Sequence, residues 1–389
     1  MNEALRAALT RWQKIALVAG LIGLAFCVLG AVVRTPQFFV SYLFGYLFWL
    51  GLALGCFGVA MIHHLTGGRW GNVTRRFLEA GFMTLPVMAV LFVPVFFGLR
   101  FLYPWAKPAL VAEDEVLRHR RVYENPGMFI GRSVLFFAIW IIMAWLLRKW
   151  SVQQDGTTDP APTRRLRKLS GPGIVIYPVT ATFAYVDWIM SLEPDWYSTM
   201  FPVIIFIGQF LSAFAFAIIL LAWFRREPPF VGVVSTTHFH HLGNLLLTFV
   251  MFWTYVSFGQ LLIIWSGNLP QEITWYLHRI AGGWKWIVVL LALFHFFLPF
   301  FLLLFRANKQ RVVILMSIAM VVFLVHIVNV FWMVVPSFYP QGIRIHWLDI
   351  AAPIGVGGIW IAVFLANLKS RRLMPQNDPR MQPVILHAK

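Results

Sequence analysis

Residues 200–224, MFPVIIFIGQFLSAFAFAIILLAWF, contain no charged side chain. An α-helix rises about 1.5 Å per residue, so this stretch is long enough to cross the roughly 30 Å hydrocarbon core of a bilayer. The whole sequence has the same character, because 60% of its 389 residues are hydrophobic and 12% are charged. A soluble domain is nearer about 25% charged. The composition therefore predicts an integral membrane protein.

Ten apolar stretches of this kind follow one another along the chain. They lack the alternating pattern of barrel strands, and backbone groups in lipid must pair internally, so we expect an all-α fold. Residues 1–370 are predicted to form one membrane domain, followed by a flexible, basic cytoplasmic tail at 371–389. The ten transmembrane helices are predicted near 15–33, 38–62, 80–99, 129–147, 172–190, 200–224, 242–264, 284–305, 312–335 and 348–368.

Basic residues set the expected orientation. If the N-terminus is cytoplasmic, the inner segments hold 22 of the 32 Lys and Arg residues. This bias follows the positive-inside rule and predicts that both termini are cytoplasmic. It places the 148–171 loop inside and the 100–128 loop outside. We interpret the net charge of +17 as a match to anionic lipid headgroups rather than to nucleic acid.

The seventh predicted helix, read from HHLGNLLLTFVMFWTYVSFGQ at 240–260, carries a polar stripe. At 100° per residue, its polar and small side chains fall within an arc of about 60°. Polar groups at membrane depth are costly, so each is a candidate functional residue. The stripe is either the lining of a proton or quinone route or a contact between helices. Its members are His241, Asn244, Thr248, Tyr255 and Gly259.

The segment DWIMSLEPDWYS, residues 187–198, holds three acids and no Lys or Arg. Asp187 shares a helix face with Thr180, and Glu193 follows beyond the predicted helix end. Acids without basic neighbours exchange protons readily, so the segment is a candidate proton exit. Two alternatives remain open. Asp187 could form an ion pair with Arg132, and Glu193 and Asp195 could simply mark the membrane surface.

Histidines lie at two depths. His63 and His64 end the second predicted helix, on the side where His238, His240 and His241 begin the seventh. His295 and His326 lie in the apolar interior of the eighth and ninth helices. They are candidates for a proton relay, for haem ligation or for hydrogen-bonded core positions. Cys27 and Cys56 are too few for an iron–sulfur cluster, and we predict no metal site.

Several motifs together resemble one family. The long run over 240–279 is the specific one, and the resemblance covers most of residues 61–284. The chain is similar to the F subunit of bacterial alternative complex III, a quinol:electron-acceptor oxidoreductase with an NrfD-like, polysulfide-reductase-like membrane fold. The other motifs are HHLTGGRWG (63–71), YPWA (103–106), LSGPG (169–173), DWIMSLEPDW (187–196) and GGW (282–284).

The resemblance implies two four-helix bundles, formed by helices two to five and six to nine and flanked by helices one and ten. It implies a subunit in the bacterial inner membrane that supports quinol oxidation and proton conduction in a respiratory or photosynthetic complex, without a redox cofactor of its own. Menaquinone, menaquinol and lipids are candidate ligands; a quinone site is implied only through the paralogous C subunit. The implied partners are that paralogue, an iron–sulfur subunit, multihaem and monohaem cytochrome c subunits, small membrane subunits and, as a further candidate, a terminal oxidase.

Two other classes remain open. Ten helices with intramembrane polar groups also suit a secondary transporter, although broken-helix signals do not recur at matching positions of two halves. A cytochrome b-type haem anchor would need histidine pairs on facing helices at matched depths. The visible spectrum of the purified chain and its co-purifying subunits discriminate among the three classes.

Overall fold

The chain folds into long, nearly antiparallel helices. The computed structural model describes residues 2–375 and 377–379; within them 83% of the chain is helical and there is no strand. Ten helical segments in this part are long and apolar enough to cross a membrane, so the protein is a multi-pass membrane protein. Single helices form six of the spans: α1 (Glu3–Val33), α2 (Thr35–Thr66), α8 (Pro126–Asp155), α10 (Phe201–Phe224), α11 (Thr236–Gly267) and α17 (Leu348–Lys369).

The other four spans are interrupted or extended by short segments. The third combines α3 (Arg69–Phe82) and α4 (Leu85–Phe97). The fifth is α9 (Ala161–Trp188) with η2 (Met190–Leu192), and the ninth is α16 (Val312–Val334) with η5 (Val335–Ser337). The eighth changes from α13 (Lys285–Leu291) to a π-helical turn, η4 (Ala292–Phe297), and then to α14 (Leu298–Leu304). The connecting elements are α5 (Leu99–Leu102), η1 (Pro104–Ala106), α6 (Pro108–Glu113), α7 (Glu115–Arg120), α12 (Pro270–Ile280), η3 (Ala281–Gly283) and α15 (Arg306–Gln310).

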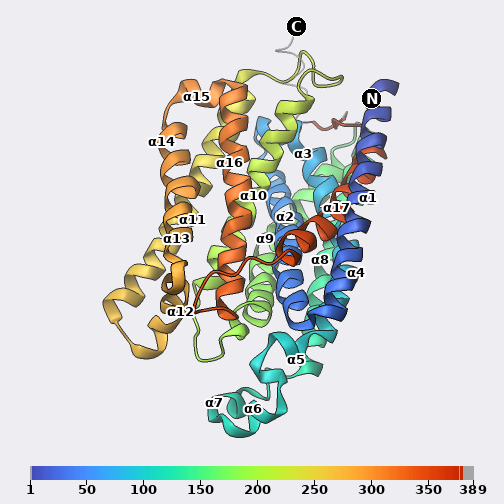
Figure 1. Ribbon diagram of the computed structural model, residues 1–389. Coiled ribbons are helices and arrows are strands. Elements are labelled where there is room, and N and C mark those ends of the chain that lie inside the picture. Colours follow the sequence, from blue (N-terminus) through green and yellow to red (C-terminus); the bar gives the residue numbers. More distant parts are fainter. Residues whose placement is uncertain (1, 376, 380–389) are drawn as a thin grey trace.

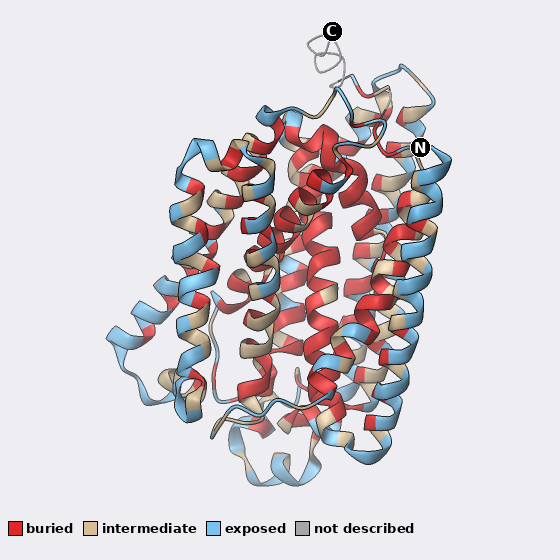
Figure 2. Ribbon diagram, turned by 45° about the horizontal axis from the view of Figure 1, so that its top comes forward, coloured by how far each residue is buried: buried red, intermediate tan, exposed pale blue. Residues whose placement is uncertain are grey.

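Helix α2 lies at the centre of the molecule. Almost every side chain from Phe38 to Met61 is buried, because α2 contacts α3, α9, α10 and α17. Figure 2 shows the buried residues gathered in the centre and the exposed ones around the perimeter. The perimeter is apolar where the helices face outward, as Val28, Val32 and Phe97 illustrate. Such a surface is suited to lipid rather than to water.

Glycines bring α1 and α17 together. A Cβ on Gly23 would lie 2.5 Å from the Gly355 nitrogen, and one on Gly20 would lie 2.7 Å from the Ile359 nitrogen. The backbones can therefore approach only because these positions lack side chains, as is common between membrane helices. The GVGG sequence at 355–358 thus packs α17 against α1. Figure 1 shows the two helices side by side, with α1 beginning at the end of the molecule opposite α7.

Several helices extend beyond their predicted limits. Helix α1 begins at Glu3 rather than near 15. The Asn2 side chain caps this start by accepting a hydrogen bond from the Leu5 N–H. The predicted inner loop at 148–171 is largely helix, because α8 continues to Asp155 and α9 starts at Ala161. Hydropathy detects only the apolar part of a helix, and backbone hydrogen bonding continues past the hydrocarbon boundary.

The predicted flexible tail at 371–389 is described in part. Within residues 371–375 and 377–379, Leu373 and Met374 are buried and the Asp378 carboxylate binds Arg75 of α3. The tail's remaining residues, 376 and 380–389, lie outside the described residues.

Candidate functional site

Asp187 is held by an arginine from a neighbouring helix. It lies in the last turn of α9, and Arg132 of α8 donates to both of its carboxylate oxygens, Nε to Oδ2 at 2.8 Å and Nη2 to Oδ1 at 3.0 Å. The Arg132 guanidinium also donates to the Tyr123 carbonyl and lies 3.7 Å from the centre of the Tyr123 ring. The candidate ion pair is therefore present, and Asp187 is fully engaged in it.

Glu193 belongs to a second ion pair. Arg279 of α12 donates to its Oε1 at 2.6 Å, and the Ser337 hydroxyl donates to the same oxygen. The His278 ring lies 3.0 Å from Oε2. Burial would raise the pKa of Glu193, but the Arg279 charge, assisted by these hydrogen bonds, outweighs it and lowers the pKa to about 2. Glu193 is thus an anion at neutral pH.

The expected absence of basic neighbours is wrong for two of the three acids. Arg132 and Arg279 are distant in sequence from Asp187 and Glu193, so only the tertiary structure brings them close. Asp195, in contrast, is exposed. A carboxylate hydrogen-bonded to a buried or half-buried guanidinium is fixed in place, which argues for a structural role of Asp187 and Glu193.

Thr180 lies among hydrogen-bonded polar groups inside the molecule. Its hydroxyl accepts a hydrogen bond from the Trp140 indole at 2.8 Å. One turn earlier, the Tyr177 hydroxyl donates to Gln209 Oε1 at 2.7 Å, and the Gln209 amide donates to the Tyr185 hydroxyl. Sequence reasoning missed Gln209, although a lone amide within the apolar run 200–224 was an available signal.

The polar stripe of α11 faces outward. Thr248 and Tyr255 are exposed, Tyr255 by 75%, while His241, Asn244 and Gly259 are partly exposed. The Thr248 hydroxyl donates to the Asn244 carbonyl within the helix. These residues therefore do not line the interior of this chain, and the candidate proton or quinone route along them stays a prediction. Helical periodicity groups side chains on one face but does not show which way that face points. The inward face of α11 carries Leu242, Leu246, Val250, Trp253, Val256 and Gln260.

The histidines at helix ends form local contacts. His63 and His64 are buried at the end of α2, with ring centres 5.8 Å apart, and His63 also packs on Trp70. His240 and His241 are neighbours near the start of α11, and the centres of their rings are 6.1 Å apart. His238 caps α11 together with Ser235.

His295 and His326 come together in the interior. Their rings are 5.5 Å apart and nearly parallel, at 15°, and both side chains are buried. His295 lies in the π-helical turn η4, and His326 lies on α16. The Trp253 ring of α11 packs edge-on against His295 at 4.3 Å. π-Helical turns inside α-helices occur frequently at functional sites.

This pair is poor in hydrogen bonds. Among the described residues, neither ring nitrogen of His295 has a partner, nor does Nδ1 of His326. The side-chain oxygen of Asn329, also buried on α16, has none either. A buried polar atom without a partner costs about 1–3 kcal/mol, so such a group is retained where a ligand or a proton transfer needs it.

The positions of the other histidines, and of the Cys, Asp and Glu side chains, bear on the haem and metal alternatives. A di-haem anchor needs two facing histidine pairs, but the other histidines within spans lie at the ends of α2 and α11. In residues 2–375 and 377–379, no group of three or more His, Cys, Asp and Glu side chains is placed to hold a metal ion.

The candidate site is therefore the His295–His326 pair with Trp253 and Asn329. The chain matches no protein-family model and no curated protein.

Proposed function

We propose that this chain is an F-type membrane subunit of a bacterial alternative complex III. In this role it supports quinol oxidation in the inner membrane, with both termini cytoplasmic, and leaves electron transfer to partner subunits. The motifs spread over residues 61–284 suggest the assignment. The observation that carries a proton-handling or quinol-binding role is the buried His295–His326 pair, since a neutral imidazole ring can offer both a lone pair and an N–H to a quinol hydroxyl.

The packing of the helices supports the NrfD-like arrangement. Helix α2 contacts α3, α4 and α9, and α8 contacts α4 and α9, which suits a first four-helix bundle. Helix α10 contacts α11 and α16, and both of these contact the eighth span, which suits a second. Contacts between α2 and α10 join the two groups, and the α1–α17 pair lies against α2.

Within this proposal, the histidine pair handles protons inside the chain, because the α11 stripe faces outward. A quinol releases two protons on oxidation, so a site for it needs acceptors inside the membrane. The free ring nitrogens of His295 and His326 supply acceptors, and Trp253 supplies an aromatic surface beside them. The two ion-paired acids nearer the helix ends would hold the surrounding helices in place.

The experiment is purification of the tagged chain from native membranes in a mild detergent. The proposal expects co-purification of an NrfD-like paralogue, an iron–sulfur protein and c-type cytochromes, with menaquinol:acceptor activity in the preparation. A chain that purifies without any haem-bearing or iron–sulfur partner, and that transports a solute in liposomes, would instead indicate a secondary transporter. A Soret band belonging to the isolated chain would indicate a haem anchor.

A further inference from the structure

A buried ionic network lies at the end of the molecule where α1 begins. Arg75 and Arg76 of α3 both bind Glu79, at 2.8 Å and 2.5 Å. Arg75 also binds Asp378 of the C-terminal segment, and Arg76 binds Asp155 at the end of α8. The side chains of both arginines are at most 3% exposed. The three acids are therefore already occupied by two arginines.

Further positive charge surrounds a small cavity beside this network. The cavity is lined by Arg76 and Glu79 and by Arg148, Arg371 and Arg372, from α8 and the chain after α17. Together with Arg75, five guanidinium groups face three carboxylates. Arg148 donates to Asn367 and Ser370, which are neutral. Counted over the described residues alone, the cluster thus carries an excess of two positive charges.

In the described part of the chain, the buried polar atoms around the cavity that lack a hydrogen-bond partner are all donors. Arg76 Nε, Arg371 Nε and Asn367 Nδ2 are buried, and each lacks a hydrogen-bond partner among the described residues. All three are donors, and all three residues line the cavity. The acceptors of Glu79 are bound by Arg75, Arg76 and Ser151. Donors without acceptors, together with excess positive charge, define a site for an anion.

The size and position of the cavity restrict that anion. Its volume is about 10 Å³, which admits one water-sized group such as a single phosphate oxygen. Arg372, one of its lining residues, is exposed, and α17 ends three residues earlier, at Lys369. The cavity thus opens at the boundary of the apolar spans, the depth of lipid phosphates.

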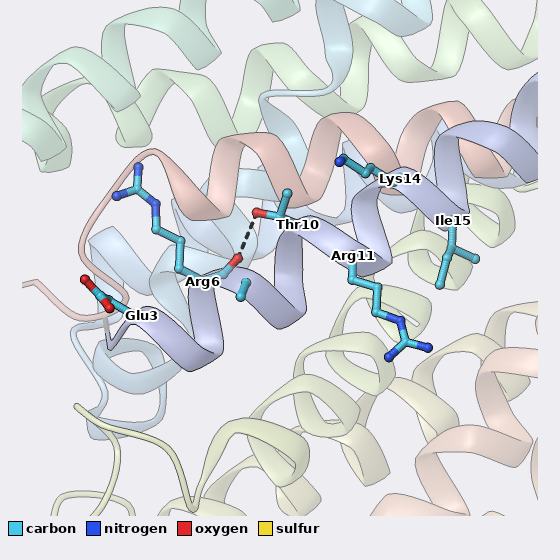
Figure 3. Close-up of a pocket in the computed structure, with 7 residues that line it drawn as sticks. Glu3, Arg6, Thr10, Arg11, Lys14 and Ile15 are labelled. Atoms are coloured by element: carbon cyan, nitrogen blue, oxygen red, sulfur yellow. Dashed lines mark hydrogen bonds between the residues drawn. The ribbon is translucent and has the colours of Figure 1, made fainter.

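A second basic groove at the same end lacks these features. Figure 3 shows Arg6, Arg11 and Lys14 on α1, where Arg6 and Arg11 extend to different sides of the helix. The groove is broad, about 860 Å³, and all three side chains are exposed to solvent. Exposed charges of this kind are hydrated and are typical of any positive membrane face. The groove therefore provides a control for nonspecific attraction.

We propose that the Arg76–Arg148–Arg371 cavity binds a phosphate-type anionic oxygen, of the kind carried by anionic phospholipid headgroups. The ligand would accept hydrogen bonds from the three unsatisfied donors and neutralise the excess charge. It would connect α3, α8 and the chain after α17, which otherwise meet through the ionic network.

The test compares ligands on the full chain purified in a nonionic detergent. Native mass spectrometry would measure binding of phosphatidylglycerol, with zwitterionic phosphatidylcholine as the reference. A parallel arm would add inorganic phosphate and follow the thermal unfolding midpoint. Wild-type protein should prefer phosphatidylglycerol on the order of tenfold, and Arg371→Gln should lose that preference. Arg11→Gln, in the exposed groove, should keep it.

The two arms separate the sources of the anion. Stabilisation by inorganic phosphate equal to that by phosphatidylglycerol, lost in Arg371→Gln, would assign the cavity to a free anion; a response to the lipid alone assigns it to a headgroup. If Arg371→Gln does not fold, Arg371→Lys keeps the charge while removing Nε and should weaken binding. Wild-type lipid preference in Arg371→Gln or Arg371→Lys, or an equal loss in Arg11→Gln, would overturn the proposal.

Discussion

Arg132 and Asp187 form a two-pronged ion pair between α8 and α9, with both carboxylate oxygens within 3.0 Å of guanidinium nitrogens. The Asp187 side chain is 1% exposed and that of Arg132 is 14% exposed. Tyr123 covers the guanidinium on one side. A charge pair this well enclosed makes each partner depend on the other, because removing one leaves the other uncompensated in a poorly hydrated place.

Asp187→Asn should therefore lower stability rather than turnover per folded molecule. We expect a loss of about 3 kcal/mol, measured by thermal or denaturant unfolding in detergent. Arg132→Gln should cost a similar amount, and the double variant should cost less than the two single losses added together. Unchanged stability with a specific loss of proton release from the assembled complex would contradict this and restore a proton-carrying role for Asp187.

Glu193 should make stability depend on pH in the acidic range. Its pKa in the folded protein, about 2, lies below its ordinary value of 4.5. The stabilisation is therefore present above about pH 5 and is lost as pH falls toward 2, by about 3 kcal/mol in total. Glu193→Gln should be less stable at pH 7, because Arg279 loses its counter-charge, and its stability should change less between pH 5 and pH 3. The exposed Asp195→Asn should retain the wild-type profile, and a steep profile in Glu193→Gln would contradict the assignment.

His295→Phe tests the interior pair. Phenylalanine keeps an aromatic ring against Trp253 and removes two unpartnered nitrogens, so stability should rise by about 1 kcal/mol. If the pair handles protons, quinol oxidation by the assembled complex should fall on the order of a hundredfold. Tyr255→Phe, on the exposed face of α11, should leave turnover unchanged. Wild-type turnover in His295→Phe would remove the pair from the proposed mechanism.

Gly23→Ala should separate α1 from α17. The added Cβ would lie 2.5 Å from the Gly355 nitrogen, and a backbone atom cannot move aside as a flexible side chain can. We expect a loss of about 2 kcal/mol in thermal unfolding, as for other overpacked sites. Gly131→Ala on α8 is the matched control, because its Cβ would meet nothing within 4 Å. That variant should be neutral or stabilising, since alanine favours helix. Equal effects of the two changes would show that the close approach contributes nothing.

The orientation can be tested by labelling single engineered cysteines in intact cells. Cys27 and Cys56 are buried, so the background should be low. Thr158 lies between α8 and α9, and Val122 is 86% exposed beyond α7, which Figure 1 places at the opposite end. A membrane-impermeant maleimide should label Val122→Cys and should not label Thr158→Cys until the cells are opened. The reverse pattern would invert the proposed orientation.

The sequence alone determined the fold class and the number of spans. A run such as 200–224 must be helical in lipid, since its backbone groups have no other partners, and ten such runs are visible from composition. The lengths of the helices were underestimated because hydropathy detects only their apolar part. The polar end of α1, residues 3–14, lies outside that part.

The tertiary structure alone decided what the polar residues contact. The α11 stripe was correctly grouped by its period, but whether Tyr255 faces the bundle or the outside depends on where α10 and the eighth span pack. The segment 187–198 contains no basic residue, yet Arg132 and Arg279 reach its acids from 55 and 86 residues away. The local sequence determines which side chains share a helix face and how much free energy it costs to bury each of them. Its partner depends on long-range packing, because a charge in a low-dielectric interior is stabilised by whichever group the fold brings within hydrogen-bonding distance.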